Sequence, residues 1–363
     1  MLLAFLLITD SASVPHAFMV PVGRAESLSV ETAGRGDPVV LIPGLFGSAY
    51  GFRKVVPLLV DAGYRTIVIE PLGVGASARP EKANYSLTAQ ADRIAAVLDS
   101  LHVRNALIMA HSIGGSEAFR LAYRRPDLVR GLLSIEGGPT EKAITPAFKR
   151  ALRFAPWIKL FGGMRLIRRK IRGMLVDSSG DPSWVTDSTV LGYTAGAGRD
   201  LDATLKAYLA MANSREPELL APRLPQIRCP VRLLVGGARH DGDVGFKEVE
   251  LLAHTLPAFA LDSVPAAGHF IQEEEPGAVL AGVVRLKASV TAAHATGSQW
   301  RRSARCASPW WPKTIIRSSG ACPSTCTTSP CSSTAGGTPL TSSRPGWGTT
   351  RTRTSCAGWA GAA

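Results

Sequence analysis

The sequence predicts an α/β protein with a mostly parallel central sheet, helices on both faces of the sheet and an inserted helical cap. Short β-branched and apolar runs alternate with amphipathic stretches from residue 27 to about residue 290. Helical sequence interrupts this alternation over residues 139–228. The composition, 45% hydrophobic and 19% charged over 363 residues, is typical of a globular chain that can form one large domain.

The individual elements follow from periodicity. Strands are expected where short apolar runs are bounded by turn residues, at residues 39–42, 66–69, 106–110, 129–135, 231–235 and 258–264. Helices are expected where apolar residues recur at a helical period, at residues 52–62, 87–101, 113–124, 244–256 and 278–286.

These patterns divide the chain into four parts. Residues 1–26 form an N-terminal segment that resembles a weak signal peptide, although no basic residue precedes its apolar run. Residues 27–138 and 229–290 form the core, and residues 139–228 form the cap. The composition of residues 291–363 predicts a disordered, low-complexity basic tail. A shifted reading frame is the alternative explanation of this tail, because it contains five of the seven tryptophans.

The distribution of charge argues against nucleic-acid binding. Ten of the thirteen net positive charges come from residues 276–363, which contain no Asp or Glu, so residues 1–275 carry only +3. Five of the six cysteines lie after residue 300, without the spacing of common zinc sites. We therefore expect no metal and no cofactor. No apolar run reaches the length of a membrane span, so a cytoplasmic location is expected, or a secreted one if residues 1–26 direct export.

The first part of the cap is strongly basic. Residues 148–175 contain nine Lys or Arg and no acidic residue. A basic amphipathic helix can lie on an anionic membrane or admit an anionic acyl substrate. A cap helix with a solvated basic face is the simpler interpretation, and we favour it. The sequence gives no indication of the oligomeric state.

The strongest motif is AHSIGG at residues 110–115, where an expected strand meets an expected helix. A turn this sharp forces strained backbone angles on Ser112, and it requires small residues two positions before and after it, as Ala110 and Gly114 are. The turn exposes the Ser112 hydroxyl and directs the Ile113 N–H towards a developing oxyanion. Ser112 is therefore the predicted nucleophile.

Three other segments accompany this motif. In the loop PGLFGS, residues 43–48, the Leu45 N–H can act as a second oxyanion donor. The segment EPLGVGAS, residues 70–77, follows the next strand. His269 lies in a Gly-flanked loop after the last strand, ahead of an acidic run.

These four segments, in this order and at these intervals, resemble the α/β-hydrolase superfamily over about residues 27–290. The resemblance implies the α/β-hydrolase fold, with Ser112 as nucleophile, His269 as general base, and the backbone N–H groups of Leu45 and Ile113 as the oxyanion hole. The chain departs from the family pattern at three positions: Pro43 for the usual His, Ala110 for the first Gly of the elbow, and Glu70 for the usual Asp.

Two positions qualify for the acid that orients the base. Asp241 lies in the loop after strand 231–235, the usual place in the family, and it is the preferred candidate. Glu136 directly follows strand 129–135, where some cap-bearing relatives keep their acid. Asp243 ranks third.

The expected function is hydrolysis of an ester-like carbonyl substrate, a small molecule with an apolar acyl group, through an acyl-enzyme on Ser112. A serine nucleophile argues against epoxide hydrolase and haloalkane dehalogenase activity, since those enzymes need an Asp nucleophile. Acyl transfer, carbon–carbon bond hydrolysis, lactone hydrolysis and perhydrolysis on the same residues remain open. A non-catalytic binding protein with this fold is the last alternative.

Overall fold

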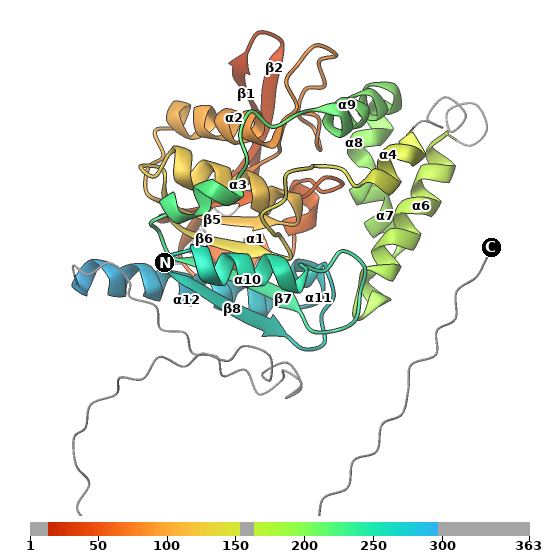
Figure 1. Cartoon of the computed structure of the whole chain (residues 1–363). Helices are drawn as coiled ribbons and strands as arrows, with labels where there is room; N and C mark the ends of the chain where they lie inside the picture. Colours follow the sequence, from red (N-terminus) through yellow and green to blue (C-terminus); the bar gives the residue numbers. More distant parts are fainter. Residues whose placement is uncertain (1–13, 153–162, 297–363) are drawn as a thin grey trace, which may run out of the picture. The chain divides into compact units, whose positions relative to one another are not determined.

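The computed structural model describes residues 14–152 and 163–296. Its centre is an eight-stranded sheet in the order β1-β2-β4-β3-β5-β6-β7-β8 (Figure 1). The strands are β1 His16–Gly23, β2 Glu26–Ala33, β3 Asp37–Ile42, β4 Tyr64–Ile69, β5 Ala106–His111, β6 Val129–Ile135, β7 Val231–Gly236 and β8 Phe259–Val264. Strands β3 to β8 are parallel, whereas β2 is antiparallel to both β1 and β4. The mostly parallel sheet is confirmed.

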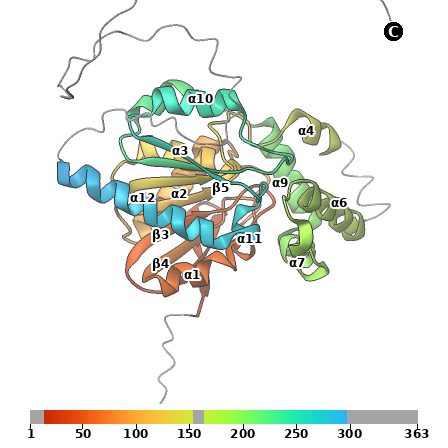
Figure 2. The same cartoon turned by 90° about the horizontal axis from the view of Figure 1, so that it is seen from below.

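Helices cover both faces of the sheet, as predicted (Figure 2). One face carries α2 Leu87–Ser100, α3 Ile113–Arg124 and α10 Phe246–Thr255, and the other carries α1 Val55–Asp61, α11 Ile271–Glu274 and α12 Pro276–Thr296. Alternate residues of β3 serve the two faces, because Val40 and Ile42 belong to one apolar core and Val39 and Leu41 to the other. A sheet buried on both faces explains the continuous apolar runs in the sequence.

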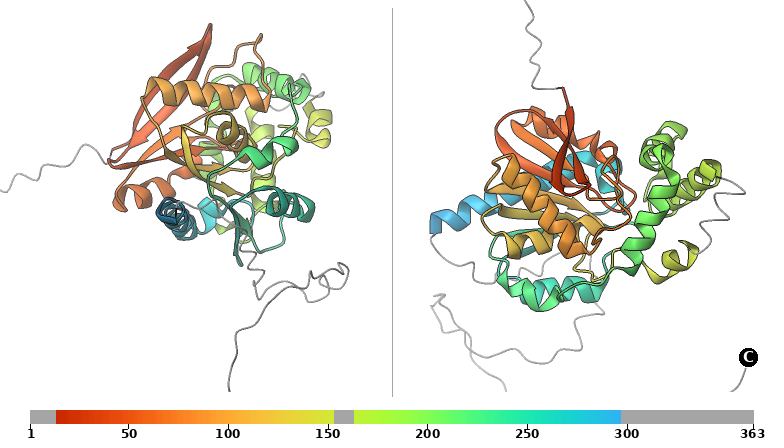
Figure 3. Two further views of the ribbon diagram at one scale, coloured as in Figure 1. Left: turned by 60° about the vertical axis from the view of Figure 1, so that its left-hand side comes forward. Right: turned by 90° about the horizontal axis from the view of Figure 1, so that it is seen from above.

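The expected helical cap lies between β6 and β7 in sequence. It comprises α4 Pro146–Leu152, α6 Gly163–Asp177, η3 Pro182–Trp184, α7 Asp187–Tyr193, α8 Ala195–Arg199, α9 Leu201–Asn213 and η4 Ala221–Gln226. The right-hand view of Figure 3 shows helices α6 to α9 together beside the sheet and its covering helices. Within residues 14–152 and 163–296, no helix is long and apolar enough to cross a membrane.

Three elements differ from the expectation. Strands β1 and β2 form an antiparallel hairpin that periodicity did not reveal. In β1 the exposed Met19 and Pro21 are as apolar as the more buried Val20 between them, so the residue types do not alternate although the burial does. The helix expected at residues 52–62 is divided into η2 Ala49–Phe52 and α1. Helix α12 continues to Thr296, past the predicted start of the tail at residue 291, in an alanine-rich stretch of high helix propensity. The rest of the predicted tail and residues 153–162 of the basic segment lie outside the described residues.

Candidate active site

Ser112 occupies the tight turn between β5 and α3. Its backbone lies in the left-handed region, with φ 55° and ψ −126°, and its N–H donates to the Ile135 carbonyl at 2.8 Å. Neighbouring chains approach the turn closely: a Cβ added at Gly114 would lie 2.9 Å from the Ile42 carbonyl oxygen. Such strain in a non-glycine residue is a feature of functional sites, and it presents the Ser112 side chain at the carboxyl edge of the sheet.

The loop after β3 passes directly beside Ser112. A Cβ added at Gly44 would lie 3.0 Å from Ser112 Cβ. Leu45 and Ile113 line the same narrow cavity, of about 10 Å³, next to this contact. Among the described residues, neither the Leu45 N–H nor the Ile113 N–H has a hydrogen-bond partner. Two unpaired backbone donors beside a strained serine have the arrangement of an oxyanion hole.

Glu70 fixes the loop that carries Leu45. Its buried carboxylate accepts hydrogen bonds from the Ala49 N–H at 2.8 Å and from the Ala76 N–H at 2.5 Å. The Leu45 carbonyl accepts a further bond from the Tyr208 hydroxyl of α9 at 2.8 Å. The cap and the loop after β4 therefore both hold the loop that carries the candidate oxyanion donor Leu45 in place.

His269 lies in the loop between β8 and α11 and is fixed through its main chain. Its N–H donates to the Ser178 carbonyl of the cap at 2.8 Å. Its carbonyl lies 2.9 Å from His111 Nε2. Because burial lowers the pKa of His111 to about 4, that ring is neutral near pH 7 and Nε2 donates this bond. His111, the residue before the candidate nucleophile, thus positions the loop that carries the candidate base.

The His269 ring is buried among aromatic neighbours, with ring centroids 4.8 Å from His111 and 5.2 Å from Phe270. Burial, and then the nearby His111 and His240 rings, hold the pKa of His269 well below its usual range. The ring is therefore neutral near pH 7, as a general base must be. In the part of the chain that the structure describes, the Ser112 hydroxyl forms no hydrogen bond. Such catalytic hydrogen bonds commonly tighten only when substrate binds.

Glu136 lies beside the base. It follows β6 with a left-handed φ of 48°, its side chain is fully buried, and its Oε2 lies 3.9 Å from His269 Nδ1. Its Oε1 accepts a hydrogen bond from the Gly236 N–H. From the sequence, Asp241 is preferred as the acid that orients His269, with Asp243 ranked third. Both residues are exposed to solvent in the structure. The structure thus brings Glu136, rather than either Asp, next to His269.

His240, in the long loop after β7, points its side chain inward towards Glu136. Its side chain is 2% exposed, its Nδ1 lies 2.7 Å from the Ala238 carbonyl oxygen and its Nε2 lies 3.5 Å from Glu136 Oε2. The interaction with the nearby Glu136 carboxylate raises the pKa of His240 to about 8. The sequence did not single out His240, because the residue pattern of a Gly-rich loop does not show which side chain points inward.

A second buried carboxyl group, on Glu117 of α3, lines the cavity next to Leu45 and Ile113. Its Oε2 has no hydrogen-bond partner among the described residues, and burial raises its pKa to about 8. The group is therefore largely protonated near pH 7. Periodicity did not single out Glu117, since a glutamate on an amphipathic helix normally lies on the solvated face.

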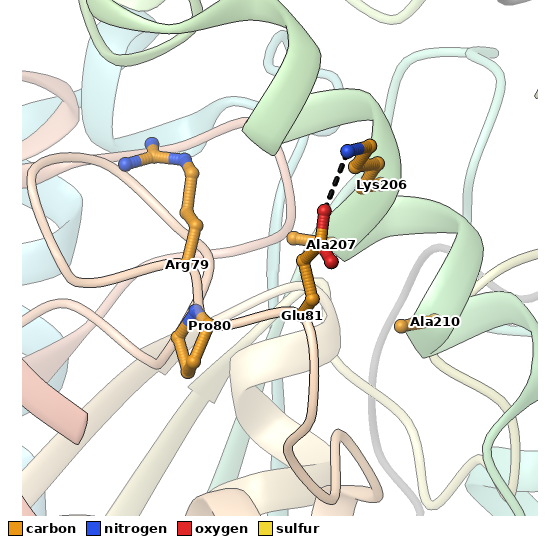
Figure 4. A pocket seen from close by; sticks show the side chains of 6 residues that line it. All are labelled: Arg79, Pro80, Glu81, Lys206, Ala207 and Ala210. Atoms are coloured by element: carbon orange, nitrogen blue, oxygen red, sulfur yellow. Dashed lines mark hydrogen bonds and ion pairs between the residues drawn. The ribbon is translucent and has the colours of Figure 1, made fainter. Parts of the chain in front are cut away.

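A larger surface cavity, of about 360 Å³, lies apart from these groups. Figure 4 shows the side chains that line it: Arg79, Pro80, Glu81, Lys206, Ala207 and Ala210. Lys206 forms an ion pair with Glu81 there, and Arg79 donates to the carbonyl groups of Gly75 and Ser77. Because no candidate catalytic residue lines this cavity, we do not assign the reaction to it.

Comparisons with known proteins agree with this fold. A family model described as alpha/beta hydrolase fold matches residues 37–161. The Bacillus subtilis protein named uncharacterized hydrolase YugF is 26% identical over 240 residues, which are 66% of this chain and 85% of that protein. Two solved structures are similar in fold. The epoxide hydrolase CorEH has a TM-score of 0.64 at 21% identity, and a thermophilic esterase from Thermogutta terrifontis has 0.61 at 22%; each match covers 76% of this chain and 99% of the other.

The substitution Glu117→Gln is expected to flatten the pH dependence of stability. The folded-state pKa of Glu117, about 8, lies above the unfolded value of 4.5, so the stability that this carboxyl group contributes is complete below pH 4.5 and is lost as the pH rises towards 8. Across that window the wild type should lose up to about 1.4 kcal/mol per pH unit relative to the variant. Denaturant unfolding of both proteins at several pH values measures the difference. The exposed Glu250→Gln serves as control, and parallel curves for wild type and Glu117→Gln would contradict the prediction.

Proposed function

Because the chain belongs to the α/β-hydrolase superfamily, we propose that it hydrolyses an ester-like carbonyl substrate through an acyl-enzyme on Ser112. One observation carries the proposal: Ser112 lies in a strained turn, flanked by the two unpaired backbone donors of Leu45 and Ile113. A carbonyl oxygen placed between these N–H groups puts its carbon in reach of the Ser112 hydroxyl.

The buried groups have distinct tasks in this mechanism. Ser112 Oγ attacks the carbonyl carbon, and the neutral His269 ring accepts the hydroxyl proton. The N–H groups of Leu45 and Ile113 stabilise the negative charge on the tetrahedral intermediate. His269 then donates the proton to the leaving group, and a water molecule activated by the same ring releases the acyl group. Glu136, 3.9 Å from His269 Nδ1, fixes the tautomer of the ring and stabilises its protonated form.

The side chain of Ser112 separates this proposal from other chemistries on the same fold. Epoxide opening and dehalogenation proceed through an alkyl ester on a carboxylate nucleophile, and the elbow of this chain has a hydroxyl group instead. The fold likeness to the epoxide hydrolase CorEH therefore does not carry its chemistry over to this chain. Acyl transfer, carbon–carbon bond hydrolysis and perhydrolysis would use the same residues and differ in substrate or acceptor.

The cavity beside the oxyanion donors supports an apolar acyl group. Its lining is mostly apolar and includes Pro71, Val74, Leu87 and Met211. Met211 comes from α9 of the cap, and the free space is about that of one water molecule. An acyl group of more than a few atoms can enter only if cap side chains such as Met211 move. Contact of the basic cap with a membrane surface stays the less favoured interpretation of residues 148–175.

A fluorophosphonate probe is expected to label Ser112, because a strained, base-assisted serine reacts with such electrophiles and an ordinary serine does not. Ser112→Ala should abolish labelling and lower kcat/KM on a short-chain p-nitrophenyl ester by roughly 10⁴-fold or more. Intact-protein and peptide mass spectrometry locate the label. The exposed Ser263→Ala serves as control and should be labelled like the wild type. Labelling that persists in Ser112→Ala would exclude Ser112 as the nucleophile.

Glu136→Gln is expected to lower kcat by about 10²-fold or more, because an amide in place of the carboxylate favours the wrong tautomer of His269 and cannot stabilise its protonated form. Asp241→Asn should stay within about twofold of the wild type, since its side chain is exposed. Steady-state kinetics on one ester substrate compare the two variants, with thermal unfolding as a check on folding. A large loss in Asp241→Asn beside a near-normal Glu136→Gln would assign the acid to Asp241.

A further inference from the structure

We propose that Glu136, His240 and His269 form a binding site for a zinc-like divalent transition metal ion, and that this ion reversibly inhibits the enzyme. The inhibition rests on the function proposed above. The binding site itself rests only on the positions and chemistry of the three side chains.

Three ligand atoms converge from separate parts of the fold. Glu136 Oε2, His240 Nε2 and His269 Nδ1 all lie within 4.8 Å of one another. The residues follow β6, β7 and β8, which are neighbours in the sheet and run parallel. The carboxyl ends of three adjacent strands thus bring the three side chains to one point.

Apart from their long contacts with one another, 3.5 Å from Glu136 Oε2 to His240 Nε2 and 3.9 Å to His269 Nδ1, these three atoms have no hydrogen-bond partner within the described residues. The side chains of Glu136, His240 and His269 are nevertheless only 0%, 2% and 12% exposed. Buried polar atoms are rarely left without a partner, and here three such atoms share one location. A single cation would satisfy all three at once.

The donor set suits zinc or a similar ion. Two imidazole nitrogens and one carboxylate oxygen are ligands that Zn²⁺ accepts in proteins, with a fourth position open to water. Zinc–ligand distances of about 2.0–2.2 Å place neighbouring ligand atoms of a tetrahedral site roughly 3.3–3.5 Å apart. The 3.5 Å between His240 Nε2 and Glu136 Oε2 already fits. The 3.9 Å between His269 Nδ1 and Glu136 Oε2, and the distance of up to 4.8 Å between the two imidazole nitrogens, require the His269 ring to move towards the other two ligands.

His240 has the orientation of a metal ligand. Its Nδ1 lies 2.7 Å from the Ala238 carbonyl oxygen, which can only accept a hydrogen bond, so Nδ1 carries a proton. In the neutral ring, Nε2 then points its lone pair towards Glu136 and His269. Metal-binding histidines typically donate their other ring N–H to a backbone carbonyl in this way.

Metal binding at this site would block the proposed base. A neutral imidazole carries one ring proton, so a metal ion on Nδ1 of His269 leaves that proton on Nε2. The ring then has no lone pair to accept the proton of Ser112. The ion would also occupy the Glu136 oxygen that orients the ring. We therefore expect bound zinc to lower kcat and to slow phosphonate labelling of Ser112.

The test is calorimetric titration of the full-length protein with zinc chloride, after chelator treatment and alkylation of its thiols, so that cysteines do not contribute. The wild type is expected to bind one ion per chain at this site, and His240→Gln is expected to weaken that binding at least tenfold. His254→Gln, which replaces an exposed histidine of α10, is the matched control and should bind like the wild type. Magnesium should not bind, because it prefers oxygen ligands.

A second measurement does not depend on the variant. Crystals of the wild type soaked in zinc should give an anomalous difference peak between Glu136, His240 and His269. Equal zinc affinity in wild type and His240→Gln, or an anomalous map with no peak at the three side chains, would overturn the site. Binding that depends on His240 in a protein without any ester hydrolysis would keep the site and refute the proposed function. Zinc binding at these residues with undiminished hydrolysis would refute the inhibition.

Discussion

The left-handed backbone at Ser112 is the constraint on which the rest of the structure depends. It lets β5 turn directly into α3, and it leaves no room for a side chain at Gly44, Gly114 or Gly115. Gly44 passes against Ser112 Cβ, and a Cβ added at Gly115 would lie 2.5 Å from Ser134 Oγ. The strained turn is stable because the sheet on both sides of β5 and the apolar cores on both faces hold it in place.

Because strands β3 to β8 run parallel, the loops that carry the other candidate site residues lie at one edge of the sheet. The loops after β3, β6, β7 and β8 end at the same edge of the sheet as the loop after β5. Each contributes one kind of group: backbone donors from Leu45, a carboxylate from Glu136, and imidazole rings from His240 and His269. The His111 ring connects the loop of the nucleophile to the loop of the base, so the positions of these two loops are not independent.

The sequence was sufficient for most of the sheet and for the candidate nucleophile and base, because burial on both faces and the steric demands of the elbow leave a direct trace in residue type. It was insufficient where a side chain's direction depends on loop conformation. The Gly-rich loop after β7 turns His240 inward and Asp241 outward, and no periodicity reports that choice. Glu117 was not predicted either, because the apolar pattern of a helix does not show that one of its carboxyl groups faces a cavity.

The hydrogen bond from the His269 N–H to the Ser178 carbonyl links the position of the cap to the position of the loop that carries His269. Ser178 belongs to the cap, and Gly180 and Asp181 nearby donate to Glu274, which follows His269 in the chain. A displacement of this part of the cap would therefore also shift the loop that carries His269. In the proposed mechanism, the cap contact thus helps to set where the imidazole lies relative to Ser112.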